Sequence, residues 1–110
     1  MIVNKTKNKI LAHEHTVYRG ILQAKGLMFS GKKAAVFPFS VPRKVSLHTL
    51  FVFYPIDILL LDSKFKVLEI KEKLEPFAFF TSKNKANYVI ELPNQVGKSV
   101  SIGDVITFSQ

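Results

Sequence analysis

The stretch LHTLFVFYPIDILLLD, at residues 47–62, constrains the fold more than any other part of this chain. Between His48 and Asp62 it carries a single formal charge, at Asp57. It is too short for a membrane-spanning helix, which needs about 20 apolar residues, and Pro55 interrupts it. Because proline fixes φ and lacks a backbone donor, the pattern predicts two buried strands that meet at a kink, with both faces of their sheet covered over part of their length.

Most of the remaining chain has the short alternating pattern of β-strands. The pattern predicts strands over 1–3, 9–17, 34–39, 44–53, 56–62, 65–74, 88–92 and 105–108. Pro38 indicates that 34–39 is an edge strand or a bulged one, and such an edge could pair between chains. The apolar side of 65–74 changes phase near Leu68, which predicts a bulge or a change of sheet, and 62–64 has the composition of a hairpin turn.

Two segments lack this alternation. Residues 18–29 place Ile21, Leu22 and Ala24 on one side of a helical turn or two that Gly26 ends, and residues 75–87 read as a loop with exposed aromatic side chains. We therefore expect a mostly β fold, either a small single-domain β-barrel or a barrel-like sandwich, with one short helix.

The length and composition limit the class of protein. The chain has 110 residues, 47% of them hydrophobic, which is enough for one domain with its own core. It contains no Cys, so disulfides, thiol nucleophiles and Cys-based zinc sites are excluded. The N-terminal sequence lacks the apolar region and cleavage site of a signal peptide, and we expect a cytoplasmic protein.

The positive charge is concentrated in the first half of the chain. Residues 1–50 hold nine Lys and Arg against one acid, whereas residues 51–110 hold seven Lys and seven acids. This asymmetry predicts an anionic partner, a nucleic acid or another polyanion, bound by one basic face; a solubilising surface is the alternative. The candidate anion-binding residues are Lys25, Lys32, Lys33, Arg43 and Lys44.

The order of motifs resembles a known family. KGLMF stands at 25–29, AVFPF at 35–39, PIDILLLD at 55–62 with KVLEI at 66–70, YVIELP at 88–93 and SIGDVI at 101–106. This order is similar to that of the domain-of-unknown-function 192 family, also called the uncharacterised ACR family, over residues 11–108. The resemblance implies a compact, mostly β domain and no established activity.

Three acids, Asp57, Glu91 and Asp104, fall within these motifs. Together they could hold a divalent cation or serve an acid–base enzyme, and Asp57 by itself could be a proton-transfer group with a raised pKa. Each also has a structural explanation. Asp57 could accept backbone N–H groups freed by the kink, Glu91 lies within a strand, and Gly103-Asp104 resembles a turn with a positive φ at the glycine.

Other site chemistry has weak support in this sequence. His13 and His15 would share one face of a strand, and His48 makes three weak candidate metal ligands, but a hydrated surface pair is the commoner explanation. No glycine-rich phosphate loop or Gly-x-Ser-x-Gly elbow occurs. We therefore expect no metal and no cofactor.

The segment 75–87 carries the remaining candidate. Phe77, Phe79 and Phe80, followed by Lys83 and Lys85, could stack on bases and contact phosphates. Phenylalanines that plug the end of a barrel are the alternative. Taken together, the sequence favours a non-catalytic binding or accessory module. Nucleic-acid binding through the basic N-terminal half and an enzyme that uses Asp57, Glu91 and Asp104 remain as alternatives.

Overall fold

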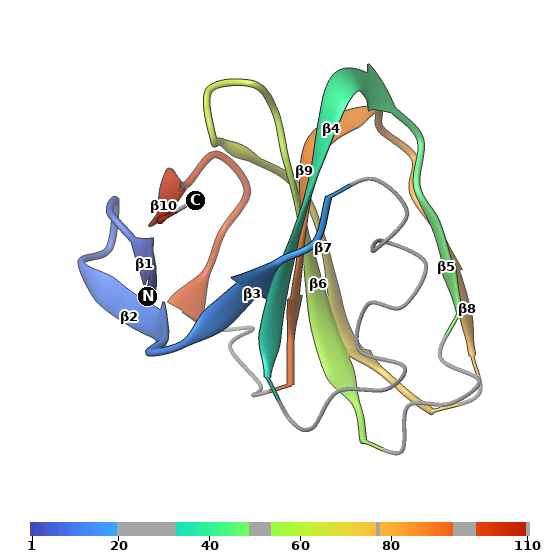
Figure 1. The fold of residues 1–110 in the computed structure, drawn as a ribbon, viewed down its shortest axis with the longest axis horizontal. Helices are drawn as coiled ribbons and strands as arrows, with labels where there is room; N and C mark the ends of the chain where they lie inside the picture. The colour runs from blue at the N-terminus through green and yellow to red at the C-terminus, as the bar shows by residue number, and fades with distance from the viewer. Residues whose placement is uncertain (20–32, 49–53, 77, 94–98, 110) are drawn as a thin grey trace.

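The computed structural model describes residues 1–19, 33–48, 54–76, 78–93 and 99–109. The strands in these segments, shown in Figure 1, are β1 (Ile2–Asn4), β2 (Lys9–Ala12), β3 (His15–Val17), β4 (Ala34–Arg43), β5 (Ser46–His48), β6 (Ile56–Leu61), β7 (Val67–Leu74), β8 (Phe79–Thr81), β9 (Ala86–Leu92) and β10 (Ile106–Phe108). They form a five-stranded sheet ordered β3-β4-β9-β6-β7, a three-stranded sheet ordered β10-β1-β2, and the ribbon β5-β8.

Strand β6 explains why the apolar stretch is so prominent in the sequence. It lies between β9 and β7, and all six of its residues are buried. A strand covered on both faces needs apolar side chains at odd and even positions alike, so it loses the usual alternation. The predicted buried strand after Pro55 is confirmed. Of the predicted strand before it, the structure describes β5, and residues 49–53 lie outside the described segments.

The two faces of the five-stranded sheet carry separate hydrophobic clusters. One cluster, here called cluster 1, includes Val36, Leu59 and Ile90; the other, cluster 2, includes Ala35, Ile58 and Val89. These residues alternate along β4, β6 and β9, as side chains do on a pleated sheet. Burying each large aliphatic side chain contributes roughly 1.5–3 kcal/mol, so the two clusters dominate the stability of the fold.

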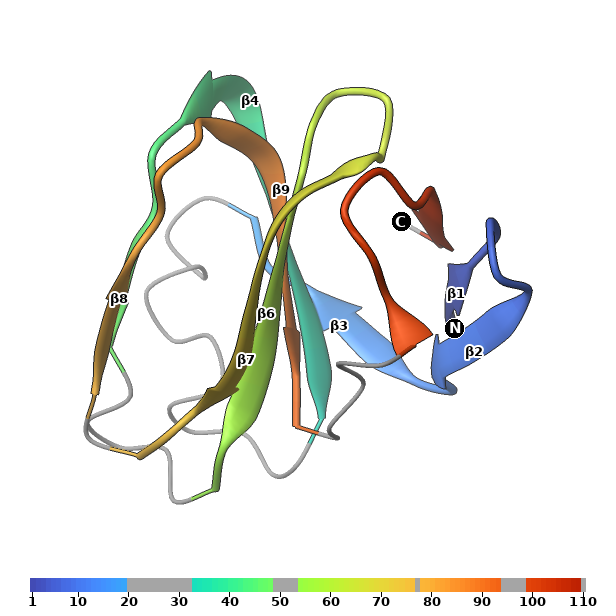
Figure 2. The same cartoon turned by 180° about the vertical axis from the view of Figure 1, so that it is seen from behind.

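The two smaller sheets lie on opposite sides of the large one. The three-stranded sheet stands beside cluster 1 and the ribbon β5-β8 stands on the other side, as the two opposed views in Figures 1 and 2 show. Three rings connect the three-stranded sheet to the large one: Phe65 stacks on Tyr88 at 4.8 Å, and Phe108 of β10 meets both rings edge-on at 5.6 and 5.5 Å. The mostly β prediction is confirmed, but the described strands form packed sheets and do not close into a barrel.

Several local predictions are confirmed. Asp62 Oδ1 accepts hydrogen bonds from the N–H groups of Lys64 (2.8 Å) and Lys66 (3.0 Å), which builds the predicted turn before β7. The register between β6 and β7 shifts between Leu60 and Leu61, because Leu68 is an extra residue there. This is the predicted bulge. A second irregularity lies at Lys73, whose φ is 50°.

Other predictions depended on long-range pairing, and some of them were wrong. The segment 9–17 is two strands, because the chain bends at His13 and β3 then joins the large sheet, parallel to β4. For segment 34–39, predicted to be an edge strand or a bulged one, the second alternative is confirmed, because β4 is bulged after Pro38 and lies between β3 and β9. The expected loop over 75–87 contains β8 and the start of β9. The expected helical turn with Gly26 lies outside the described residues, as do Lys25 and Lys32. Within the described segments, no helix has the length and hydropathy needed to cross a membrane.

Candidate functional site

Asp57 is a buried acid with a structural partner. It begins the pairing of β6 with β9 opposite Leu92, and 2% of its surface is exposed. Its Oδ1 accepts a hydrogen bond of 2.7 Å from the backbone N–H of Lys73, at the bulge of β7. The carboxylate therefore satisfies a donor that the bulge removes from the ladder, and so helps to hold β6 and β7 in register.

Asp104 belongs to the junction between the two ends of the chain. Its Oδ2 accepts hydrogen bonds from Asn4 Nδ2 (2.8 Å) and from the N–H of Ser101 (2.9 Å), and Lys7 Nζ lies 3.4 Å away. The hydrogen bond from Asn4 does most to hold the pKa of Asp104 below its usual range. The preceding Gly103 has a φ of 90°, as predicted for a turn that needs glycine.

Glu91 has a different environment. It pairs with Ile58 on one side and Ala35 on the other, so its side chain lies on the cluster 2 face of the large sheet. Only 7% of its surface is exposed. Burial raises its pKa from the ordinary value of 4.5 to about 7, because an apolar surrounding disfavours the charged form.

Two tyrosines that were not candidate site residues in the sequence lie near Glu91. Tyr54, just before β6, has a pKa that is raised first by burial, then by the charge of Glu91, and then by Tyr18. Tyr18, just after β3, stacks on Phe37 with ring centres 5.4 Å apart. Both tyrosines are half-buried and pack against cluster 2. The one hint in the sequence is that Tyr54 precedes Pro55, where the buried strand begins.

The three candidate acids do not meet. Asp57 and Glu91 pair with Leu92 and Ile58, which are adjacent positions across the same two strands, so their side chains lie on opposite faces. Asp104 lies beside β1, at the three-stranded sheet. No group of three His, Cys, Asp or Glu within the described segments is placed to hold a metal ion. The arrangement offers one carboxyl group of raised pKa, Glu91, and two acids with structural partners.

The histidines are also apart. His13 lies at the bend between β2 and β3, and the side chain of His48 lies outside what the structure describes. His15 Nε2 donates to the carbonyl of Ser109 at 2.7 Å, so its Nδ1 accepts from the amino group of Met1 at 3.1 Å. With both ring nitrogens engaged, His15 joins the two ends of the described chain.

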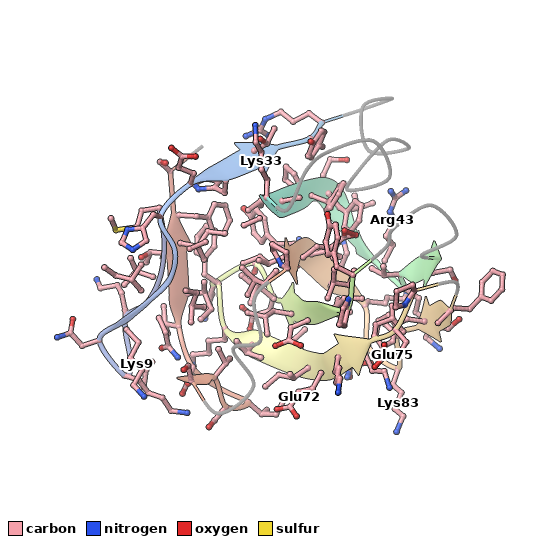
Figure 3. The ribbon with its side chains drawn as sticks, turned by 90° about the horizontal axis from the view of Figure 1, so that it is seen from below. Lys9, Lys33, Arg43, Glu72, Glu75 and Lys83 are labelled. Atoms are coloured by element: carbon pink, nitrogen blue, oxygen red, sulfur yellow. The ribbon has the colours of Figure 1, made fainter. Side chains whose placement is uncertain are left out.

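The candidate basic residues occupy several places. Lys33 precedes β4 and Arg43 ends it, so the length of that strand separates them, and Lys9 starts β2. Figure 3 shows Lys9 on the side of the molecule opposite Arg43. The described basic residues of the first half therefore do not form the single face that was predicted.

Two segments that carry four basic residues, from both halves of the chain, pair with each other instead. Arg43 pairs with Ala86 across β4 and β9, and Ser82 exchanges two hydrogen bonds of 2.8 Å with the backbone of Val45. These pairings bring 43–45 against 82–86. We call the exposed cations of this region the basic corner; they are Arg43, Lys44, Lys83 and Lys85.

Acids are few at the basic corner. Segments 41–46 and 81–87 contain none. Glu69 reaches the corner from β7, where its carboxylate accepts hydrogen bonds from the N–H groups of Lys83 (2.9 Å) and Asn84 (3.1 Å). Glu75 lies on the same side of the molecule in Figure 3. The guanidinium of Arg43 lies 4.1 Å from the centre of the Phe39 ring, which fixes its position over an aromatic face.

The aromatic candidates of β8 point in different directions. Phe79 is 74% exposed, whereas Phe80 packs against cluster 2, as expected for neighbours on a strand. Phe77 lies outside the described residues. Of the two described stacking candidates, Phe79 is therefore the one placed to meet a base.

The mostly β fold is accompanied by a match to a known family. The model of the family DUF192, Uncharacterized ACR, matches residues 4–108, and the chain belongs to this family. It is 32% identical to a UPF0127 protein of Pyrococcus horikoshii, over 96% of each chain. The family is one of uncharacterised proteins, and the matches indicate no specific function.

Two solved structures resemble this one. A protein of unknown function from Novosphingobium aromaticivorans superposes with a TM-score of 0.83, covers 97% of this chain and 82% of its own, and is 20% identical. That likeness shows the shared fold. A protein of Sinorhizobium meliloti, described as a "putative transcription regulator", has a TM-score of 0.73 and 26% identity, over 83% of this chain and 78% of its own.

Proposed function

We propose that this chain is a non-catalytic binding module whose partner is a single-stranded nucleic acid, bound at the basic corner. The observation that carries the proposal is the pairing of segment 43–45 with segment 82–86, which brings together two segments that carry four exposed cations, Arg43, Lys44, Lys83 and Lys85. Phosphate contacts of this kind supply much of the affinity for nucleic acids and make it salt-dependent.

A second feature supports a single strand rather than a duplex. Phe79 stands exposed on β8, which leads directly into the basic corner at 82–86. An exposed ring beside cations suits an unpaired base, because each base has a face on which an aromatic ring can stack. The similarity to the Sinorhizobium meliloti protein, described as a "putative transcription regulator", is compatible with such a partner.

The alternative enzyme is less well supported. It requires Asp57, Glu91 and Asp104 in one site, and the strand register separates them.

A cytoplasmic location belongs to the present proposal, since RNA is abundant there. Fractionation of cells that express the tagged protein would test that location.

The binding test measures fluorescence anisotropy of labelled single-stranded RNA and DNA across a salt series, with heparin as a general polyanion. We expect the variant R43Q/K44Q/K83Q/K85Q to lower the magnitude of the log–log salt slope by about 3, since each single-strand phosphate contact contributes about 0.7. Phe79→Ala should weaken binding roughly 5- to 100-fold, the range for one lost stacking contact.

A matched variant separates a site from a general charge effect. K5Q/K9Q/K33Q/K64Q removes the same number of exposed cations from other parts of the surface. Lys7 is left intact because it pairs with Asp104. An equal loss of binding in both quadruple variants, or equal affinity for heparin and for nucleic acid, would overturn the proposal.

A further inference from the structure

Glu91 and its surroundings have no role in binding at the basic corner. The carboxyl group lies on the cluster 2 face, between Ile58 and Ala35, with 7% of its surface exposed. A buried carboxylate is costly unless a partner offsets the loss of hydration. Within the described segments, the ion pair is that of Lys7 and Asp104, and no described cation is paired with Glu91.

The neighbouring side chains are aromatic. Tyr54 and Tyr18 pack against cluster 2, the face on which Glu91 lies. Burial, followed by the charges of Glu91 and Tyr18, raises the pKa of Tyr54. Tyr18 stacks on Phe37, which lies two residues along β4 from the partner of Glu91 and therefore on the same face. The group thus combines one acid with the faces and hydroxyl groups of two tyrosines.

The group is accessible from the surface at its tyrosine side. Tyr18 and Tyr54 are both half-buried, whereas Glu91 is buried with 7% of its surface exposed. A cation is attracted by the negative face of an aromatic ring, more strongly as water is removed, and by a carboxylate that it can neutralise. An anion would be repelled, and a neutral apolar group would leave the carboxylate without a partner.

We propose that Glu91, Tyr54 and Tyr18 form a binding site for a small organic cation, with Glu91 as the counter-charge and the two tyrosine rings as the walls. The ligand class is an amine or quaternary ammonium group. This site lies on other residues than the basic corner and serves a ligand of opposite charge, so it goes beyond the proposed nucleic-acid function and does not depend on it.

Binding of a cation should be linked to loss of the Glu91 proton. The ligand favours the carboxylate, so its affinity rises as the pH passes through about 7, the pKa of Glu91, and levels off about one pH unit higher, where the carboxylate predominates. Tetramethylammonium is a suitable probe because its own charge does not change with pH. Its affinity should be about tenfold lower at pH 6 than at pH 8, since only about a tenth of the sites are ionised at pH 6.

The experiment titrates the full chain with tetramethylammonium chloride and follows the amide signals of 57–58 and 89–92 by NMR. Sodium chloride controls for ionic strength, and tert-butanol is a neutral compound of similar shape. We expect saturable shifts with tetramethylammonium, a loss of binding in Glu91→Gln, and a clear loss in Tyr54→Ala with a smaller one in Tyr54→Phe, which keeps the ring. Glu72→Gln, a change at an exposed glutamate of β7, should bind like the wild type.

Three results would overturn the site. They are saturation by tert-butanol at equal concentration, unchanged binding in Glu91→Gln, and the absence of saturable shifts at pH 8. Glu91→Gln removes a buried charge and keeps the shape, so this variant folds if the surrounding packing is as described. Nucleic-acid binding by the same variants should equal that of the wild type, which keeps the two proposals separate.

Discussion

At the scale of single residues, the buried acids have two kinds of environment. Asp57 and Asp104 accept hydrogen bonds from named donors, the N–H of Lys73 and the side chain of Asn4. Glu91 instead lies on an apolar face, where burial raises its pKa to about 7. Acids that accept hydrogen bonds hold the backbone in place, whereas an acid that is only buried lowers the stability of the fold once it ionises.

This difference predicts a pH dependence of stability. Between pH 4.5 and about 7, Glu91 is ionised in the unfolded chain and protonated in the folded one, so the folded state binds more protons. The stabilisation is complete below pH 4.5 and is lost as the pH rises to about 7. The free energy of unfolding should fall by about 3 kcal/mol over that range through Glu91 alone.

Urea unfolding of the wild type and of Glu91→Gln at intervals from pH 4.5 to 8 would measure this loss. The difference between the two proteins isolates Glu91 from the other titrating groups. Glu72→Gln, at an exposed position, is the control and should follow the wild type. Parallel curves for wild type and Glu91→Gln would show that Glu91 keeps an ordinary pKa.

At the scale of elements, β7 is the strand with the most irregular pairing. It has two register shifts against β6, and the residue at the second, Lys73, has a positive φ. A positive φ is unfavourable for a residue with a side chain and persists where the surroundings determine it. The carboxylate of Asp57 stabilises this conformation, because its Oδ1 accepts a hydrogen bond of 2.7 Å from the N–H of Lys73.

Asp57→Ala should therefore destabilise the protein by about 1–3 kcal/mol, the cost of a buried hydrogen bond whose donor remains. Asp57→Asn keeps an acceptor oxygen and should lose less than half as much. Denaturant unfolding gives the totals, and hydrogen exchange at the amide of Lys73 reports on the bond itself. If Asp57→Ala left exchange at Lys73 unchanged, the carboxylate would not be what holds the bulge.

At the scale of the whole molecule, three aromatic rings join the two larger sheets. Phe108 of the three-stranded sheet contacts Phe65, just before β7, and Tyr88 of β9, and His15 meets Phe108 edge-on at 6.2 Å. The ends of the chain, β1 and β10, pair with each other in this small sheet. The packing of these rings therefore holds the small sheet, which contains both β1 and β10, against the large sheet.

Phe108→Ala should lower the free energy of unfolding by about 2–3 kcal/mol, somewhat less than for a fully buried phenylalanine because the ring is half-buried. Phe79→Ala removes the same group from a site that is 74% exposed, and it should change stability by no more than about 0.5 kcal/mol. Thermal or urea unfolding followed by circular dichroism compares the two. Equal losses would mean that the contacts of Phe108 add no stability beyond those of an exposed ring.

Local chemistry in the sequence was enough to predict the kinds of elements and several of their details. The buried strand after Pro55, the turn at Asp62, the bulge near Leu68 and the positive φ at Gly103 each depend on residues a few positions apart. The order of motifs also indicated the family, which the comparison confirmed. Such features are readable because the conformation of a short segment follows largely from its own side chains.

The tertiary structure alone decided which distant residues become neighbours. Shifting β6 against β9 by one residue would move Asp57 to the face that carries Glu91, so their separation follows from the register between two residues 34 positions apart in the sequence. The same kind of pairing, between β4 and β9, assembled the basic corner from both halves of the chain. It also placed β4 inside the sheet despite Pro38. Register is chosen by the burial of both faces at once, and no short segment of sequence contains that information.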